Sequence, residues 1–105
     1  MADVIDDQQN FTITLLLQGY AVHGTVTGIP STAYAGDVIN AVLAAQNTGG
    51  ADEMFVKLID VDTSAVLGEN RQTVLAGATA NFNISFTMPA KTLNLRALYG
   101  HNDNR

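Results

Sequence analysis

The stretch that most constrains the fold is an alternating apolar run bounded by two turn signals. The run follows the pair Gly36-Asp37 and ends at Asn47-Thr48-Gly49-Gly50. A period of two is typical of a strand buried on one face. A helix over residues 38–46 is the competing interpretation, because the second face is only half polar. The β-branched start and the Asn-Thr-Gly-Gly ending favour a strand. Its apolar positions are Ile39, Ala41, Leu43 and Ala45.

Short segments with strand patterning follow one another along the rest of the chain, and turn residues separate them. No convincing helix interrupts them, so we expect an all-β antiparallel sandwich of seven to eight strands with Greek-key links. Gly24 is expected to mark a β-bulge or a close backbone approach. The further predicted strands are residues 11–17, 20–27, 54–61, 66–68, 72–75, 81–88 and 93–99. The predicted core is Phe11, Ile13, Leu15, Ile39, Leu43, Phe55 or Val56, Leu58, Leu75, Phe82, Ile84, Phe86, Leu95 and Ala97.

The length of 105 residues predicts one domain that buries a core of its own. We divide it into an acidic N-terminal arm (residues 1–10), a single β-sandwich domain (residues 11–100) and a polar tail (residues 101–105). The acidic start and the absence of a long apolar run predict no export signal and no membrane-spanning segment in the sequence as given.

Charge excludes some partners. Charged residues make up 14% of the chain, and ten acids against five bases give a net charge of −5. Nucleic acid and anionic membranes attract clustered basic residues, so neither is an expected partner. With no cysteine, disulfides and zinc–thiolate sites do not arise. The basic residues are scattered singly, at Lys57, Arg71, Lys91, Arg96 and Arg105.

One acidic cluster is a weak candidate for calcium. Asp60 and Asp62, together with Glu53, supply the oxygen ligands that calcium prefers. Ser64 and Ala65 stand at the fifth and sixth positions, where the calcium-loop template needs a ligand and Gly. A solvated turn is therefore the favoured interpretation, and no metal or cofactor is expected.

Catalytic residue sets are not suggested by the spacing. His23 is expected on the outer face of a strand and His101 in the tail, and no serine has the sequence context of a nucleophile. We therefore predict a protein that is not an enzyme. The tyrosines at 20, 34 and 99 could stack on a sugar, although aromatic residues near strand ends more often cap a core.

Several turn and core motifs resemble the immunoglobulin-like module known as the cell-adhesion-related CARDB type, over about residues 28–99. The resemblance implies an immunoglobulin-like fold and a spacer or adhesive role in surface proteins. Modules of this type continue into a final strand, whereas this sequence ends at Arg105 and has two extra predicted strands before residue 28. Either those strands fill the missing edge or a partner chain donates one. The motifs are Ala35-Gly36-Asp37, Asn47-Thr48-Gly49, Phe55-Val56-Lys57-Leu58, Leu75-Ala76-Gly77-Ala78-Thr79 and Phe86-Thr87-Met88-Pro89.

The sequence favours a structural subunit that builds or decorates a larger assembly, such as a virion or an extracellular surface structure. Its partners would be further copies of itself or other structural subunits. The alternative is an adhesion module that binds carbohydrate or protein through residues 47–53 and 60–64. The segment 11–17 is β-prone and uncharged, so a neighbour must cover it. The candidate interface residues are Val4, Ile5, Phe11, Ile13, Leu15, Leu16 and Leu17.

Overall fold

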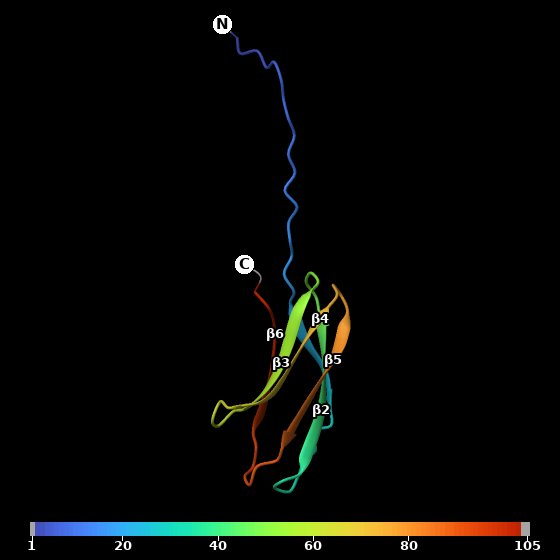
Figure 1. Ribbon diagram of the computed structural model, residues 1–105, viewed down its shortest axis with the longest axis vertical. Coiled ribbons are helices and arrows are strands. Elements are labelled where there is room, and N and C mark those ends of the chain that lie inside the picture. Colours follow the sequence, from blue (N-terminus) through green and yellow to red (C-terminus); the bar gives the residue numbers. More distant parts are fainter. Residues whose placement is uncertain (1, 104–105) are drawn as a thin grey trace.

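The computed structural model describes residues 2–103, which contain six β-strands and no helix (Figure 1). Every strand pairing is antiparallel, so the all-β antiparallel prediction is confirmed. The strands form two sheets of three, with the orders β1-β2-β5 and β4-β3-β6. Their bounds are β1 Ala21–Thr27, β2 Val38–Asn47, β3 Asp52–Asp60, β4 Val66–Val74, β5 Thr79–Thr87 and β6 Leu95–His101.

The core lies between the two sheets, and the central strands β2 and β3 supply much of it. Leu43 of β2 lies opposite Phe82 of β5, and both side chains are fully buried. Burial alternates along β2, as a strand with one face in the core requires. Residues 38–46 therefore form the expected strand and not the competing helix. The buried apolar residues are Ile39, Ala41, Leu43, Ala44, Ala45, Met54, Val56, Leu58, Val74, Phe82, Ile84 and Phe86.

Most of the predicted core is confirmed within β2, β3 and β5. Val56, and not Phe55, takes the buried position on β3, while Phe55 lies beneath Lys57 and Arg71 on the outer face. Leu95 and Ala97 of β6 pack against the core and are partly buried. The prediction of Leu75 was wrong, because β4 ends at Val74 and that residue is the buried one.

Three of the predicted strands differ from the observed ones. Residues 66–68 and 72–75 were expected as separate strands, but β4 runs without a break from Val66 to Val74. Residues 11–17 form no strand, and Phe11, Ile13 and Leu15 are exposed instead of lying in the core. The reason is that this segment has no strand beside it in the chain, and a strand needs a partner for its backbone hydrogen bonds.

The N-terminal segment instead extends away from the sheets (Figure 1). It prolongs the longest axis of the molecule, so that the overall extents are 87 × 26 × 15 Å. Its direction continues that of β1, whose register shifts between His23 and Val26. This irregularity includes Gly24, and a Cβ there would lie 3.2 Å from the Ala44 carbonyl oxygen, so both the bulge and the close backbone approach predicted at Gly24 are observed.

Candidate functional site

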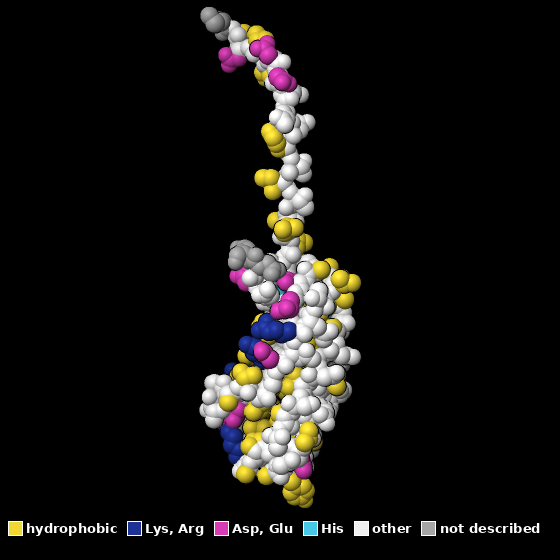
Figure 2. Space-filling view, in the orientation of Figure 1, with side chains coloured by type: hydrophobic (Ala, Val, Ile, Leu, Met, Phe, Trp, Pro, Cys, Tyr) yellow, Lys and Arg dark blue, Asp and Glu magenta, His cyan; other side chains and the backbone are white. Residues whose placement is uncertain are grey.

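An exposed apolar arm is the most unusual feature of the molecule. Here the arm means residues 2–17, which is longer than the predicted arm of residues 1–10. All seven predicted interface residues, from Val4 to Leu17, lie on it and are exposed. Ile13 is 95% exposed, and apolar side chains are visible along the length of the arm (Figure 2). A monomer gains nothing from holding such side chains in water, so the arm is a candidate contact surface.

The root of the arm, residues 18–20, is fixed to the sheets by a buried asparagine. The Asn47 side chain is 0% exposed. Its Oδ1 accepts hydrogen bonds from the backbone N–H groups of Tyr20 (3.1 Å) and Gly49 (3.0 Å). Its Nδ2 donates to the carbonyls of Gly50 (2.8 Å) and Val74 (3.0 Å). One side chain therefore joins the root, the loop after β2 and the end of β4.

Further hydrogen bonds set the direction in which the arm leaves. The Gly19 N–H donates to Oδ2 of the buried Asp52 at 3.0 Å, and the Gly50 N–H donates to the Gln18 carbonyl at 2.9 Å. A Cβ on Gly50 would lie 2.3 Å from the Leu17 carbonyl oxygen, which only glycine allows. The chain is consequently held up to Leu17.

The two long sides of the molecule differ in how they are closed. On one side, the Asn70 and Gln72 side chains of β4 donate hydrogen bonds to the carbonyls of Asn83 (3.1 Å) and Asn81 (2.8 Å) on β5. These side chains occupy backbone acceptors at the β5 edge. The edge that faces β4 is thereby protected from pairing with another strand.

The opposite side, between β1 and β6, is open. Within residues 2–103, no hydrogen bond joins β1 to β6, and their ring contact is His23 with Tyr99, whose centroids are 6.0 Å apart. Val26 pairs with the buried Leu43 and so points toward the core, yet it is 47% exposed. On β6, Leu95, Ala97 and Tyr99 face the core and are only partly buried. Val26, Leu95, Ala97 and Tyr99, which are all partly exposed, line the strip between β1 and β6, and we call this strip the groove.

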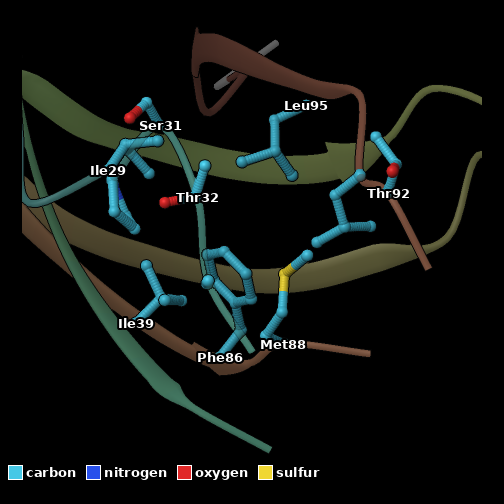
Figure 3. A pocket seen from close by; sticks show the side chains of 11 residues that line it. Ile29, Ser31, Thr32, Ile39, Phe86, Met88, Thr92 and Leu95 are labelled. Atoms are coloured by element: carbon cyan, nitrogen blue, oxygen red, sulfur yellow. The ribbon is translucent and has the colours of Figure 1, made fainter. Parts of the chain in front are cut away.

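A pocket of about 280 Å³ lies at one end of the groove (Figure 3). It is formed where the chain leaves β1 and enters β6, and its floor is apolar, with Ile39, Phe86 and Met88. Leu95 lies at its wall, and the hydroxyl side chains of Ser31, Thr32 and Thr92 lie around it. The volume is slightly below the usual range of small-molecule sites, which begins at about 300 Å³.

The acidic residues proposed for calcium are not all together. Asp60 and Glu53 lie near opposite ends of β3, seven residues apart, which is about 23 Å along a strand. Asp60 and Asp62 do share a turn, where Asp60 Oδ1 accepts the Asp62 N–H at 3.0 Å. Within residues 2–103 no group of three or more His, Asp or Glu side chains could hold a metal.

Asp60 is instead engaged by a lysine. Its carboxylate accepts a hydrogen bond from Lys91 Nζ across the end of the sheet. That hydrogen bond, supported by the Asp62 N–H and opposed by burial, lowers the pKa of Asp60 below its ordinary value of 3.8. The cluster is a structural ion pair that ties the segment before β6 to β3.

The histidines and tyrosines that the sequence offered as candidates do not come together in one site. His23 was expected on the outer face of its strand, but it faces Tyr99 across the groove, because its partner Ala45 is buried. His101 was assigned to the tail and is the last residue of β6. Burial raises the pKa of the Tyr99 hydroxyl. Tyr20 and Tyr34 lie beyond opposite ends of β1, so the three tyrosines form no single platform.

Sequence reasoning missed the Asn47 hydrogen-bond centre and the groove. The Asn-Thr-Gly-Gly motif did signal a turn, and a polar residue at the inward phase of an apolar strand was the available clue to Asn47. No sequence signal showed which sheet edge would be left open.

Comparisons with protein families, curated proteins and solved structures found no match for this chain. The described residues also include no helix long and apolar enough to cross a membrane.

Proposed function

We propose that this protein is a non-enzymatic structural subunit that assembles with copies of itself or with other subunits through its N-terminal arm. The observation that carries the proposal is the exposed apolar segment Phe11–Leu17 on a root that is hydrogen-bonded to the sheets. A larger structure such as a virion or an extracellular surface layer is the proposed setting. The low fraction of charged residues, 14%, suits a protein with much of its surface in contact with neighbours.

The free energy available from covering the arm supports this function. Burying a Leu, Ile or Phe side chain contributes about 1.5–3 kcal/mol, and four such residues alternate along the segment at Phe11, Ile13, Leu15 and Leu17. Part of this gain is offset by the entropy lost when the arm becomes ordered. The balance favours association, and an uncovered β-prone segment would favour aggregation.

The proposed fold is an immunoglobulin-like β-sandwich of the CARDB type. In such sandwiches one sheet contains strands A, B and E, and the other contains C, F and G. The sheet orders support this assignment, because β1-β2-β5 corresponds to A-B-E and β3-β6 to C-F. Strand G would lie at the outer edge of β6, where residues 2–103 supply no strand.

The mass of the protein in solution tests the function. Light scattering on the full chain at micromolar concentration should give a mass larger than that of a monomer. A variant with Phe11→Ser, Ile13→Ser and Leu15→Ser should be monomeric, because it loses three of the four apolar side chains that alternate along the segment Phe11–Leu17. Circular dichroism should still show the β-rich fold of residues 21–101, since the side chains of Phe11, Ile13 and Leu15 are exposed and lie outside the core.

The matched control places the same number of substitutions in the acidic part of the arm, at Asp3→Ser, Asp6→Ser and Asp7→Ser. This variant should keep the wild-type mass. A wild-type chain that is monomeric throughout the concentration range would overturn the proposed function.

The second candidate function is a binding module for protein or carbohydrate, and the pocket beside Leu95 favours it. Residues 47–53 and 60–64, which were the candidate binding loops, lie at opposite ends of β3 and do not form one surface. This function predicts a monomer that binds a ligand regardless of the arm variant, and screening the triple serine variant against a glycan array would detect it.

A further inference from the structure

The groove beside β6 has the features of a site for one additional strand. β6 is the edge strand of its sheet, and its seven residues are paired on one side only. The inward residues Leu95, Ala97 and Tyr99 remain partly exposed, as does Val26 across the groove. A strand laid along β6 would pair its free backbone groups and cover all four side chains.

The segment Phe11–Leu17 has the length and the pattern that this site needs. It contains seven residues, as β6 does. As a strand it would direct Phe11, Ile13, Leu15 and Leu17 to one face and Thr12, Thr14 and Leu16 to the other. The apolar face would enter the groove, while two of the three residues on the outer face are threonines.

The β6 edge suits a new strand better than the β1 edge. The register of β1 shifts between His23 and Val26, and a bulge interrupts regular pairing. The pairing of β6 with β3 has no such shift over seven consecutive residue pairs. Proline, the residue that blocks edge pairing, is absent from β6, which carries one charged side chain, Arg96.

The arm cannot easily reach the groove of its own chain. The root is fixed by the hydrogen bonds to Gln18, Gly19 and Tyr20, and the Leu17 carbonyl lies against Gly50. A reversal next to Leu17 would place about four residues of the segment Phe11–Leu17 in the turn, so that only about three of its seven residues could pair along β6. The arm points away from the sheets along the long axis (Figure 1).

From these observations we propose that the segment Phe11–Leu17 of one copy adds to the outer edge of β6 in a second copy as an antiparallel strand. This deepens the proposed function and rests on it. Every pairing in the fold is already antiparallel, the slightly more stable arrangement. The donor is the copy that supplies the arm, and the acceptor is the copy that supplies β6. In the antiparallel direction Leu17 of the donor lies beside Leu95 and the pocket of the acceptor. The sheets of the donor then lie beyond the pocket end of the acceptor.

The resulting contact is head-to-tail. Each copy inserts its arm into one neighbour and receives an arm from another, so the interface joins two different surfaces and the chain of subunits stays open. A parallel insertion would instead allow two copies to exchange arms reciprocally in a closed dimer.

A donor–acceptor mixing experiment on the full chain tests this contact. Ile13→Asp with Leu15→Asp disables the arm and leaves the groove intact. Val26→Arg fills the groove and leaves the arm intact. Each variant alone should be monomeric by light scattering, and an equimolar mixture should form a 1:1 dimer, because one partner supplies the arm and the other the groove.

Matched controls separate the faces of the two strands. Thr12→Asp with Thr14→Asp changes the opposite face of the arm, and Val22→Arg changes the outer face of β1, since Val22 pairs with the exposed Gln46. Both control variants should assemble like the wild type. In case Val26→Arg does not fold, Val26→Cys can be folded first and then blocked with a bulky thiol reagent, because the chain has no other cysteine.

Each outcome has a distinct meaning. If the wild type assembles, the arm variant does not, and Val26→Arg still assembles, the proposed function stands and the β6 site is overturned. A wild type that stops at a closed dimer would overturn the antiparallel, head-to-tail arrangement. A wild type that is monomeric would overturn both proposals.

Discussion

At the scale of single residues, Asn47 is the side chain on which the geometry of the arm depends. It is buried at the end of β2 and makes hydrogen bonds to three separate parts of the chain, namely the root, the following loop and the end of β4. An apolar side chain at this position could be buried equally well, but it would leave these backbone groups without hydrogen-bond partners. A buried polar group without a partner costs more than the hydrogen bond itself contributes.

We predict that Asn47→Ala lowers the free energy of unfolding by about 2–4 kcal/mol, because the backbone groups at Tyr20, Gly49, Gly50 and Val74 lose a partner. Urea unfolding measures this change. Asn40→Ala is the matched control, since Asn40 is an exposed residue of the same strand, and its effect should stay within about 0.5 kcal/mol. Equal effects of the two substitutions would contradict the role assigned to Asn47.

The ion pair between Lys91 and Asp60 gives a prediction for pH. The pKa of Asp60 is lower in the folded state than its ordinary value of 3.8, so this carboxylate contributes stability above that pH and loses it as the pH falls through the folded value. Lys91→Met should therefore destabilise the protein at neutral pH and make the acid limb of its stability profile shallower. Urea titrations at neutral pH and well below 3.8 measure the difference.

Lys57→Met serves as the control for charge, because the Lys57–Glu69 pair at 3.7 Å is largely solvated and such pairs contribute little. It should leave the profile nearly unchanged. A Lys91→Met profile parallel to that of the wild type would show that Lys91 does not hold the pKa of Asp60 down.

At the scale of elements, the arm and β6 are complementary: the arm supplies apolar side chains that nothing covers, and β6 supplies an edge that no strand pairs with. The segment Phe11–Leu17 of the arm has apolar alternation and pairs with no strand among residues 2–103, while β6 has an unpaired edge beside partly exposed core residues. The side of the molecule between β4 and β5 is different, because two side chains of β4 already donate hydrogen bonds to backbone carbonyls of β5. The same fold thus closes one side with its own side chains and leaves β6 as an unpaired edge on the other side.

Proteolysis reports on this complementarity. We predict that chymotrypsin cuts the arm at Phe11 or Leu15–Leu17 rapidly in the monomeric Val26→Arg variant and far more slowly in the wild-type assembly, because a paired strand is protected. Mass spectrometry of a digestion time course measures both rates. Trypsin is the control protease, since residues 2–20 contain no Lys or Arg. Equal chymotrypsin rates would mean that the arm stays uncovered in the assembly.

At the scale of the whole molecule, length and asymmetry decide the kind of assembly. The arm extends one end of a molecule that is 87 Å long and only 26 × 15 Å across. The chain segments after β1 and before β6, which line the pocket, lie at the other end (Figure 1). A contact between two unlike surfaces joins subunits into an open series, unless the rotation between neighbours closes the series into a ring. The proposed contact therefore predicts linear growth, and we expect its extent to depend on concentration.

The local sequence determined the class of the fold. Alternation between turn signals located β2, β3 and β5 to within two residues at each end, because in these strands one face meets the core and the other meets water. The same patterning identified seven of the buried core residues and the bulge at Gly24. It also singled out the seven arm residues as contact candidates.

The tertiary structure alone decided where each strand pairs. The segment Phe11–Leu17 reads as a core strand, yet it lies in water, because strand formation depends on a neighbour that no local pattern can specify. The exposure of β1 and the partial exposure of the inward residues of β6 have the same cause. Both are edge strands, and the order of strands in the sheets determines which edges remain free. Sequence periodicity fixes which face of a strand is apolar, and only the arrangement of the sheets decides whether anything covers it.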